Sequence, residues 1–501
     1  VLSGVARALG VSVADPRPPG AAGRAESGRI EVFSLMSADG FRWMVESLVT
    51  NFTGFVPLGT VLVALLGVGV AERSGLLSAA IRGMVLAAPK QLVTVMVVLA
   101  GVLSNTAAEM GYVVLIPLAA VIFHAMGRHP LAGLAAAFAG VSGGYSANLL
   151  IGTVDPLLAG ITEEAARFLD PEYMVHPAVN WYFMAGSTFL ITALGSWVTV
   201  RIVEPRLGPY DPADADESVD RAPKLEGLTA AEKRALLAAG VAAGIVTIGI
   251  VWLAGPFPGV LGGTAVAEWT GWGLLRNPKT GGLLPSPLLR GVVAMILVFF
   301  LVPGFVYGRV TGTMRTDRDV IDAMAATMST MGLYIVLVFF AAQFVAYFGK
   351  SNLGMIVAVW GADALRAMGL DNPLVFLPFI LMCCVVNLML GSASAQWAVT
   401  APIFVPMLMS VGYSPEVIQA AYRIGDSCTN IITPMMSYFG LILAFAARYD
   451  RKLGIGTLMS TMLPYCIFFT VGWTAFFYLW VFALGWPVGP GAPTYYPAPG
   501  G

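Results

Sequence analysis

Residues 392–406 read S-A-S-A-Q-W-A-V-T-A-P-I-F-V-P, and residues 422–434 read Y-R-I-G-D-S-C-T-N-I-I-T-P. These segments place hydroxyl and amide side chains, one Arg, one Asp and helix-breaking Gly and Pro residues inside apolar sequence of membrane length. A bilayer tolerates such residues only where they are buried in protein or line a wet cavity. Residues 104–155 have the same kind of content in the first half of the chain. Two broken, polar-studded apolar segments in corresponding halves indicate a secondary transporter.

The composition is that of a polytopic membrane protein. The chain has 501 residues, of which 57% are hydrophobic and 11% are charged, against roughly 25% charged residues in a soluble globular domain. The mean hydropathy is +0.78. We therefore predict an all-α fold in a lipid bilayer. The net charge of −1 gives no indication of a nucleic-acid partner.

Residue types that carry catalysis or bind metals are scarce. The four cysteines lie in apolar sequence, where we expect small buried hydrophobes, and the three histidines offer no ligand spacing with them. The sequence has no G-x-x-x-x-G-K-[S/T] loop, so ATP hydrolysis is not expected. We predict that the protein is not an enzyme and has no cofactor besides a coupling ion, Na⁺ or H⁺.

Apolar runs of about 20 residues predict the membrane spans. Two segments, 318–327 and 353–368, are expected to be amphipathic helices at the membrane surface. The predicted spans lie near residues 54–71, 91–103, 112–126, 131–154, 179–200, 236–257, 289–307, 328–348, 371–390, 398–411, 427–447 and 460–485.

Clusters of Lys and Arg predict the orientation in the membrane. We place four basic segments on the cytoplasmic side, namely 72–90, 201–235, 309–318 and 448–452. The segments expected outside are 18–45, 258–288 and 487–501.

A polar linker divides the chain into halves of comparable size. The predicted organisation is 1–90, N-terminal scaffold helices; 91–204, a first core with a hairpin and a broken helix; 205–235, the linker; 236–370, scaffold or dimerisation helices; 371–447, a second core of the same kind; and 448–501, a C-terminal helix and tail. The chain begins with Val, and its opening looks like the tail of an apolar span, so we expect the first helix to be truncated.

Polar residues interrupt the first core at two places. Residues 92–103 are too short to cross the membrane comfortably, so the simplest path is a hairpin that enters, turns near residue 105 and leaves through residues 113–123. The segment S-G-G-Y-S-A-N at 142–148 is expected to unwind a helix and expose carbonyls. Carbonyl, hydroxyl and amide oxygens suit a hard cation. The candidate ion-binding or coupling residues here are Ser104, Asn105, Thr106, Asn148 and Asp155.

The second core repeats this arrangement. Residues 387–396 would form the tip of a second hairpin, and residues 425–434 a second broken helix. The segment at 146–153 can be laid over the one at 428–434, with Asn148 on Asn430. The candidate residues are Asn387, Ser394 and Asn430 for substrate, and Ser392 and Thr429 for an ion. Na⁺ is possible at four amides: Asn105, Asn148, Asn387 and Asn430.

Arg423 and Asp426 form the most informative pair. They are three residues apart and share a helix face. A purely structural ion pair is one interpretation. In the other, Arg423 binds an anionic substrate group, while Asp426 holds Arg423, carries a proton or ligates a cation. Trp397 follows the hairpin tip directly and is predicted to form a cavity wall, so we expect these side chains to face a hydrated vestibule.

Longer motifs resemble those of the AbgT family of bacterial transporters. N-F-T-G-F-V-P-L-G at 51–59, followed by L-G-V-G-V-A-E-R-S-G-L at 66–76, is similar to the opening signature of that family. The segments 104–110, 144–155 and 392–434 resemble it in order and spacing. The resemblance covers essentially the whole chain.

The resemblance implies a dimeric transporter of the bacterial inner membrane. It implies about nine transmembrane helices and two inverted re-entrant helical hairpins in two inverted repeats, similar to divalent-anion/sodium symporters, with a cavity open to the cytoplasm. It also implies uptake of p-aminobenzoyl-glutamate, a folate breakdown product, or export of sulfonamides. The functionally important residues of the family motif fall on Trp397, Pro415, Arg423 and Asp426. For a further acid in the first half, Asp155 is the candidate and Asp170 the runner-up.

These observations together predict a secondary active transporter for p-aminobenzoyl-glutamate or related aromatic carboxylates and sulfonamides. Three alternatives remain: a sulfonamide efflux pump as the main role, a di- or tricarboxylate–sodium symporter of the same fold, and an intramembrane hydrolase. The tryptophan beside the hairpin tip disfavours the second, and the scarcity of histidines disfavours the third.

Overall fold

The computed structural model describes residues 1–17, 24, 26–107, 111–211, 215–216, 219, 227–255, 272–283 and 286–496. In these ranges the chain is helical apart from one small sheet, in which β1 (Ser12–Ala14) pairs antiparallel with β2 (Arg29–Glu31) and Val13 lies opposite Ile30. Residues 108–110, which follow the predicted turn of the first hairpin, and parts of the predicted linker and outer loop lie outside the described residues.

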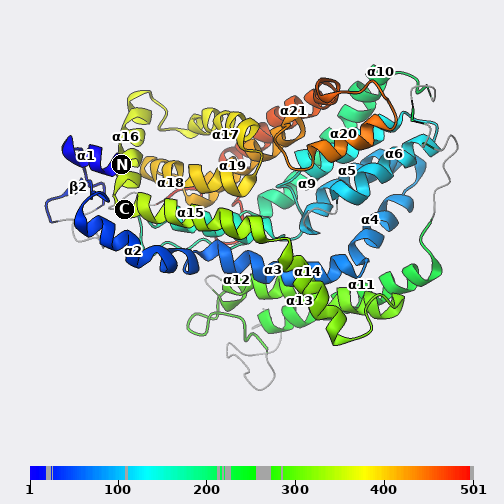
Figure 1. Cartoon of the computed structure of the whole chain (residues 1–501), viewed down its shortest axis with the longest axis horizontal. Helices are drawn as coiled ribbons and strands as arrows, with labels where there is room; N and C mark the ends of the chain where they lie inside the picture. Colours follow the sequence, from blue (N-terminus) through cyan, green and yellow to red (C-terminus); the bar gives the residue numbers. More distant parts are fainter. Residues whose placement is uncertain are drawn as a thin grey trace.

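The helices of the first half are α1 (Leu2–Ala8), α2 (Ala38–Thr53), α3 (Val56–Arg73), α4 (Leu76–Leu86), α5 (Val93–Ser104), α6 (Ile116–Ala125), α7 (Pro130–Phe138), α8 (Val154–Ala166), α9 (Trp181–Val198) and α10 (Glu204–Leu207). The long helices are α2, α3 and α9, with a run of shorter, interrupted helices between α3 and α9 (Figure 1). Single wider turns extend three of these helices, at Gly111–Leu115, Ala139–Gly143 and Thr199–Val203.

The second half contains the longest uninterrupted helices. They are α11 (Ala230–Ala254), α12 (Pro287–Arg290), α13 (Val292–Thr311), α14 (Asp317–Ser329), α15 (Gly332–Lys350), α16 (Leu353–Ala367), α17 (Phe376–Leu390), α18 (Ala393–Val411), α19 (Pro415–Thr429), α20 (Phe439–Ala447) and α21 (Ile455–Phe477). The predicted surface helices 318–327 and 353–368 correspond to α14 and α16.

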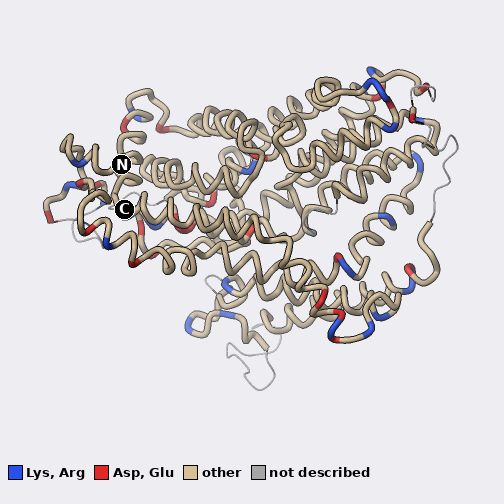
Figure 2. The backbone as a smooth tube through the Cα atoms, in the orientation of Figure 1, with Lys and Arg blue, Asp and Glu red and all other residues tan. Residues whose placement is uncertain are grey.

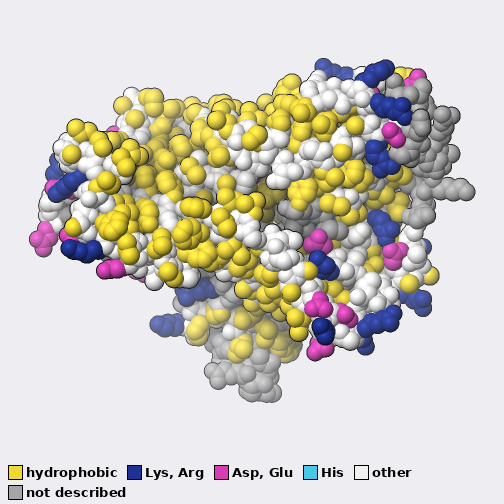
Figure 3. Space-filling view, in the orientation of Figure 1, with side chains coloured by type: hydrophobic (Ala, Val, Ile, Leu, Met, Phe, Trp, Pro, Cys, Tyr) yellow, Lys and Arg dark blue, Asp and Glu magenta, His cyan; other side chains and the backbone are white. Residues whose placement is uncertain are grey.

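Eight helices within the described residues are long and apolar enough to cross a membrane, or nine if the bent pair of α4 and α5 forms one span. Charged residues gather mainly toward the two ends of the long axis (Figure 2). Apolar side chains cover the middle of the face seen in Figure 3. This is the pattern of a multi-pass membrane protein, because an apolar belt faces hydrocarbon and charges remain in the polar interfaces.

The structure adds detail to two predicted segments. The segment 18–45, which is expected outside, runs into a helix, since α2 begins at Ala38 behind the capping side chain of Ser37 and forms one long apolar stretch with α3. The predicted span 131–154 is not continuous, because the helix ends at Gly143 and resumes at Val154. The Gly-Gly pair at 143–144 is where the unwinding starts, as the sequence indicates.

Close helix contacts depend on small residues. In the layer formed by α3, α11 and α13, a Cβ on Gly67 would lie 2.3 Å from the carbonyl oxygen of Leu297. In the layer around α5, a Cβ on Gly140 would lie 2.4 Å from the carbonyl oxygen of Val98. Small residues let membrane helices approach each other closely where apolar side chains gain little from leaving lipid.

Two pairs of apolar segments run out and back. The chain leaves through α5 and returns through residues 111–125, so that Arg128 donates a hydrogen bond to Thr94 at 2.8 Å. Likewise α17 and α18 are joined at Gly391, whose φ of +54° makes the turn. The ring of Phe376, at the start of α17, lies 4.8 Å from that of Tyr413, just after α18.

Gly140→Val is expected to lower the melting temperature in detergent, because the added side chain must displace α5. Such overpacking typically costs about 1–3 kcal/mol. The matched control is Gly240→Val in α11, where nothing lies within 4 Å of an added Cβ. Differential scanning fluorimetry compares the two variants; equal melting temperatures would show that the close approach of α5 is not a constraint.

Candidate functional site

The two broken helices meet where each is unwound. The first unwinds between Gly143 and Val154, and the second between Ile432 and Phe439. The backbone N–H of Ser146 donates to the hydroxyl of Ser427 at 3.1 Å. The amide of Asn430 lies 3.5 Å from the carbonyl of Ser142. The predicted interruptions of the two halves therefore form one polar centre, although they are far apart in the sequence.

The second hairpin is attached to this centre through Asn387. Its side-chain nitrogen lies 2.6 Å from the carbonyl of Asp426, 2.9 Å from the hydroxyl of Thr429 and 2.8 Å from the Oδ1 of Asn430. Asn387 is fully buried. An amide has only two N–H donors, so three acceptors must share them. This arrangement holds α17 against the point where α19 ends.

The first hairpin makes a comparable contact in its own half. The hydroxyl of Thr106 donates to the Oδ1 of Asn148 at 2.7 Å, and the amide of Asn105 lies 3.4 Å from the carbonyl of Gly144. Asn148 and Asn430, aligned in the sequence, thus both accept a hydrogen bond from the hairpin of their own half. The structure brings the predicted candidate residues of each core together.

Several buried oxygens at this centre have no hydrogen-bond partner within the described residues. They are the Oδ1 of Asn105, the Oδ1 of Asn387 and both carboxylate oxygens of Asp426. Buried acceptors normally find a partner, so such a group suits a cation or a proton. The described part of the chain holds no cluster of three His, Cys, Asp or Glu. The chemistry available is therefore that of a hard cation bound mainly by amide, hydroxyl and carbonyl oxygens.

Arg423 does not pair with Asp426 in the structure, so the interpretation of these two residues as a structural ion pair is wrong. Arg423 forms an ion pair with Asp155, whose second oxygen accepts the N–H of Gly152 at 2.7 Å. Asp155 lies in the first turn of α8, where free N–H groups and the helix dipole favour a carboxylate. Arg423 and Asp426 share a helix face, but the carboxylate of Asp155, on another helix, is better placed to bind the guanidinium. Asp155 is also the predicted acid of the first half, and it joins the site; Asp170 instead contacts Tyr496.

The prediction that Arg423 faces a hydrated vestibule is wrong for the conformation in this structure. Only 2% of its side chain is exposed, against 15% for that of Asp155. Its Nε and Nη1 atoms are buried and have no hydrogen-bond partner among the described residues. The guanidinium is therefore sealed from water in this conformation, although two of its nitrogens lack a hydrogen-bond partner among the described residues.

Trp397 also differs from the prediction, because it is fully buried and forms no cavity wall here. Its ring stacks on Tyr422 at 4.1 Å, and its Nε1 donates to the hydroxyl of Thr162 at 2.9 Å. That hydroxyl lies 2.5 Å from the Oε1 of Gln419, whose amide donates to Asn180 at 2.7 Å. The sequence offered no signal for this network, since its members come from α8, α9, α18 and α19.

Pro415 begins α19 at the end of the same network, as the residues alone suggested. The Ser414 side chain caps the helix by accepting the N–H of Val417. The neighbouring Glu416 is buried, and the hydroxyl of Tyr173 donates its one hydrogen to this carboxylate, lying 2.9 and 3.1 Å from the two oxygens. The C-terminal segment lies against this end, where Ser414 donates to the carbonyl of Pro493 at 2.5 Å.

A cavity of about 500 Å³ lies beside the polar centre. Predicted residues that line it are Asn105, Ser392, Ser394 and Asn430, whereas Trp397, Arg423 and Asp426 do not. Tyrosines that were not predicted also line it: Tyr112, Tyr145, Tyr334 and Tyr438. Glu72 and Arg73, at the end of α3, line it as well, and the prediction places them on the cytoplasmic side.

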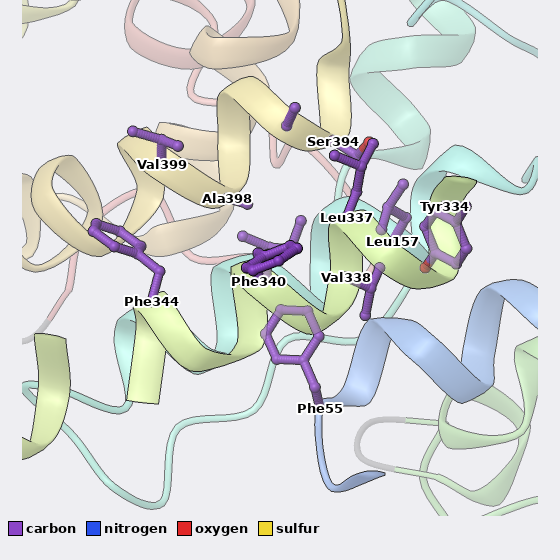
Figure 4. Close-up of a pocket in the computed structure, with 13 residues that line it drawn as sticks. Phe55, Leu157, Tyr334, Leu337, Val338, Phe340, Phe344, Ser394, Ala398 and Val399 are labelled. Atoms are coloured by element: carbon purple, nitrogen blue, oxygen red, sulfur yellow. The ribbon is translucent and has the colours of Figure 1, made fainter. Parts of the chain in front are cut away.

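An apolar crevice of about 310 Å³ adjoins this cavity between α15 and α18 (Figure 4). Phe340 and Phe344 of α15 face Ala398 and Val399 of α18 across it. Three residues line both hollows: Leu157, Tyr334 and Ser394. The hydroxyl of Tyr334 donates to the carbonyl of Pro57 at 2.8 Å, which holds the Tyr334 side chain in place between the cavity and the crevice.

Comparison with known proteins gives matches over nearly the whole chain. The model of the AbgT putative transporter family matches residues 1–496. The p-aminobenzoyl-glutamate transport protein of Escherichia coli K12 is 36% identical over 98% of this chain and 91% of its own length.

Two solved structures share the fold. The YdaH transporter of Alcanivorax borkumensis is 45% identical with a TM-score of 0.86, covering 98% of this chain and 97% of that one. MtrF of Neisseria gonorrhoeae, described with a class of antimetabolite efflux pumps, is 56% identical with a TM-score of 0.88, covering 98% and 94%.

A double-mutant cycle tests the Arg423–Asp155 pair. We expect Asp155→Asn and Arg423→Gln each to lower the melting temperature strongly, because loss of one partner leaves a buried charge unpaired, at a cost of about 3–5 kcal/mol. The double variant should lose less than the sum of the two. The exposed pair Arg366–Asp363 is the control and should show little coupling. Additive losses at residues 155 and 423 would contradict the pairing.

Proposed function

The chain belongs to the AbgT family of putative transporters, and from this premise we propose that it moves p-aminobenzoyl-glutamate or related aromatic carboxylates and sulfonamides across the bacterial inner membrane. The observation that carries the proposal is the central cavity, which joins polar hairpin residues of both halves to a tyrosine-lined wall. A pocket of this size, mostly apolar with a few placed polar groups, suits a small organic ligand. The identity with the p-aminobenzoyl-glutamate transport protein supports the substrate class.

The two out-and-back pairs are proposed to be re-entrant hairpins in two inverted repeats, as in divalent-anion/sodium symporters. The Arg128–Thr94 and Phe376–Tyr413 contacts support hairpins that return to the side from which they entered. The matched Asn148 and Asn430 contacts support the repeat. In this mechanism the hairpins and broken helices move against the layer of α3, α11 and α13.

Arg423 is proposed to bind the substrate anion in a second conformation. In the structure Asp155 occupies one guanidinium nitrogen, and two others are unpartnered. A substrate carboxylate that replaces Asp155 would gain a bidentate contact. Movement of α8 away from α19 would admit it and free the Trp397 network at the same time, since Thr162 lies on α8.

A coupling ion is proposed at the unpartnered oxygens of the hairpin tips. Na⁺ would be held around Asn105 and Asn148 in one half and around Asn387 and Asn430 in the other. Ser104, Ser392 and Thr429 lie close by in the sequence and extend the set of oxygens. For H⁺ coupling, Asp426 is the group to carry the proton, because its carboxylate is buried without a partner in the described structure.

A homodimer is proposed for the assembled transporter. The α11 helix supports it, because only 11% of its most apolar 18-residue window is buried within one chain. Such a face needs lipid or a second protomer against it. The two chains would then hold the outer layer still while each core moves.

Export of antimetabolites is the second candidate for the main role, favoured by the 56% identity with MtrF. A di- or tricarboxylate–sodium symporter is the third, and the four cavity tyrosines disfavour it. Counterflow in proteoliposomes distinguishes import from export. Competition by citrate or succinate would support the di- or tricarboxylate–sodium symporter.

Three variants test the transport mechanism: Trp397→Ala, Arg423→Ala and Asp426→Ala. In a strain lacking its own transporters, uptake and efflux of p-aminobenzoyl-glutamate should fall at least about tenfold in Arg423→Ala, since a lost charge-assisted contact is worth about 1.5–3 kcal/mol. Transport should also fall in Trp397→Ala, which removes the contact between α18 and α8, and in Asp426→Ala, which removes the proposed proton carrier. Arg423→Lys should not restore transport, because an ammonium cannot bind a carboxylate bidentately. Arg366→Ala, on an exposed arginine, is the control. Wild-type rates in all three variants would refute the mechanism.

Varying Na⁺ and pH independently in proteoliposomes identifies the coupling ion. If Na⁺ is coupled, Asn387→Ala should remove stimulation by Na⁺ without altering the response to a pH gradient. If H⁺ is coupled, Asp426→Asn should remove the response to the pH gradient instead. Transport that ignores both gradients in the wild type would exclude both assignments.

A further inference from the structure

We infer that the aromatic ring of the substrate binds to a tyrosine subsite of the central cavity, built on the stacked pair Tyr112–Tyr438, rather than on Trp397. The inference rests on the proposed function, because it concerns how the same cavity selects its substrate. The ligand class is a planar aromatic ring joined to an amide or sulfonyl group that bears or adjoins an anionic group.

The rings of Tyr112 and Tyr438 already stack on each other. The ring centroids of Tyr112 and Tyr438 lie 4.6 Å apart with an interplanar angle of 7°. Tyr112 is buried behind Tyr438, and its hydroxyl lies 3.2 Å from the hydroxyl of Ser142. Tyr438 is partly exposed and lines the cavity. Since offset and parallel aromatic pairs are favourable, Tyr438 can carry a third ring on its cavity side.

The pair also joins the two halves of the protein. Tyr112 lies on the return leg of the first hairpin, and Tyr438 ends the unwound part of the second broken helix, just before α20. A ring stacked there lies within the cavity that Asn105 and Asn430 also line. Substrate binding at this place would therefore contact moving elements of both cores at once.

The rest of the cavity wall matches the remaining groups of such a ligand. Tyr145 and Tyr334 add two partly exposed phenol rings. Ser392 and Asn430 supply polar groups for an amide or sulfonyl oxygen. Arg73 is the only cationic side chain among the described residues that line the cavity, and it lies at the end of α3 beside Glu72, which also lines it.

Trp397 and the apolar crevice are both poorer places for the ring. Trp397 is buried, and Tyr422 already occupies one of its faces. The crevice contains only Tyr334 and Ser394 as polar lining residues, so it offers nothing to a carboxylate. Burying an anion without a partner is strongly unfavourable, which leaves the tyrosine-lined cavity as the better site.

The test compares tyrosine variants for ligands with and without a ring. In proteoliposomes, Tyr438→Leu and Tyr112→Leu should raise the KM for p-aminobenzoyl-glutamate about three- to tenfold, the range expected for one lost aromatic pair, with Vmax largely kept. Tyr438→Phe should retain the wild-type KM. Inhibition by N-acetylglutamate, which has the amide and carboxylates without the ring, should be unchanged in Tyr438→Leu.

Phe340→Leu in the crevice is the matched control and should leave the KM unchanged. Calorimetry on purified protein gives the Kd for p-aminobenzoyl-glutamate and for an aromatic sulfonamide independently of transport. Wild-type binding and transport with unchanged KM and Kd in Tyr438→Leu would overturn the subsite alone. A raised KM in Phe340→Leu together with an unchanged KM in Tyr438→Leu would overturn the tyrosine subsite and indicate that the ring binds in the crevice. If the wild type binds neither ligand, both the subsite and the proposed function are overturned.

Discussion

The whole architecture depends on satisfying unwound backbone inside an apolar belt. Helix ends and interrupted turns expose N–H and C=O groups that hydrocarbon cannot bond, so protein side chains must replace water there. Asn387 does so for the second broken helix by approaching the carbonyl of Asp426, and Asn105 lies near the carbonyl of Gly144 in the first. The paired segments α5 with residues 111–125, and α17 with α18, thus supply amides that approach the exposed carbonyls where the two helices are interrupted.

The buried charge of Arg423 is likewise balanced in part by another side chain of the protein. Arg423 and Asp155 come from different halves, and each is positioned by its own helix, α19 and α8. Their pairing accompanies removal of the Arg423 charge from water and of most of the Asp155 side chain, which is favourable only while the geometry is good. Two nitrogens of Arg423 have no partner among the described residues, so the guanidinium is not fully satisfied by this pair.

The sequence was most informative where polar residues interrupt apolar segments. Polar residues in apolar runs predicted the two interruptions and the turns between the paired helices, because membrane physics leaves few uses for such residues. Asn148 and Asn430 each accept a hydrogen bond there. The sequence did not predict which residues on different helices contact each other. The pairing of Arg423 with Asp155, the burial of Trp397 on Tyr422 and the tyrosine pair Tyr112–Tyr438 depend on how α8, α18, α19 and the hairpins pack together. Tyrosines in an apolar chain are ordinary residues, so nothing in their spacing distinguishes a cavity wall from a membrane interface.

The shared wall between the crevice and the cavity has a pharmacological consequence. Leu157, Tyr334 and Ser394 each face both hollows, and the crevice separates α15 from α18. An apolar compound wedged between Phe340 and Ala398 would fix the spacing of those two helices without resembling the substrate (Figure 4). Such a compound would not need to enter the larger cavity, and replacing Leu157 or Ser394 with a larger side chain to exclude it would narrow that cavity as well.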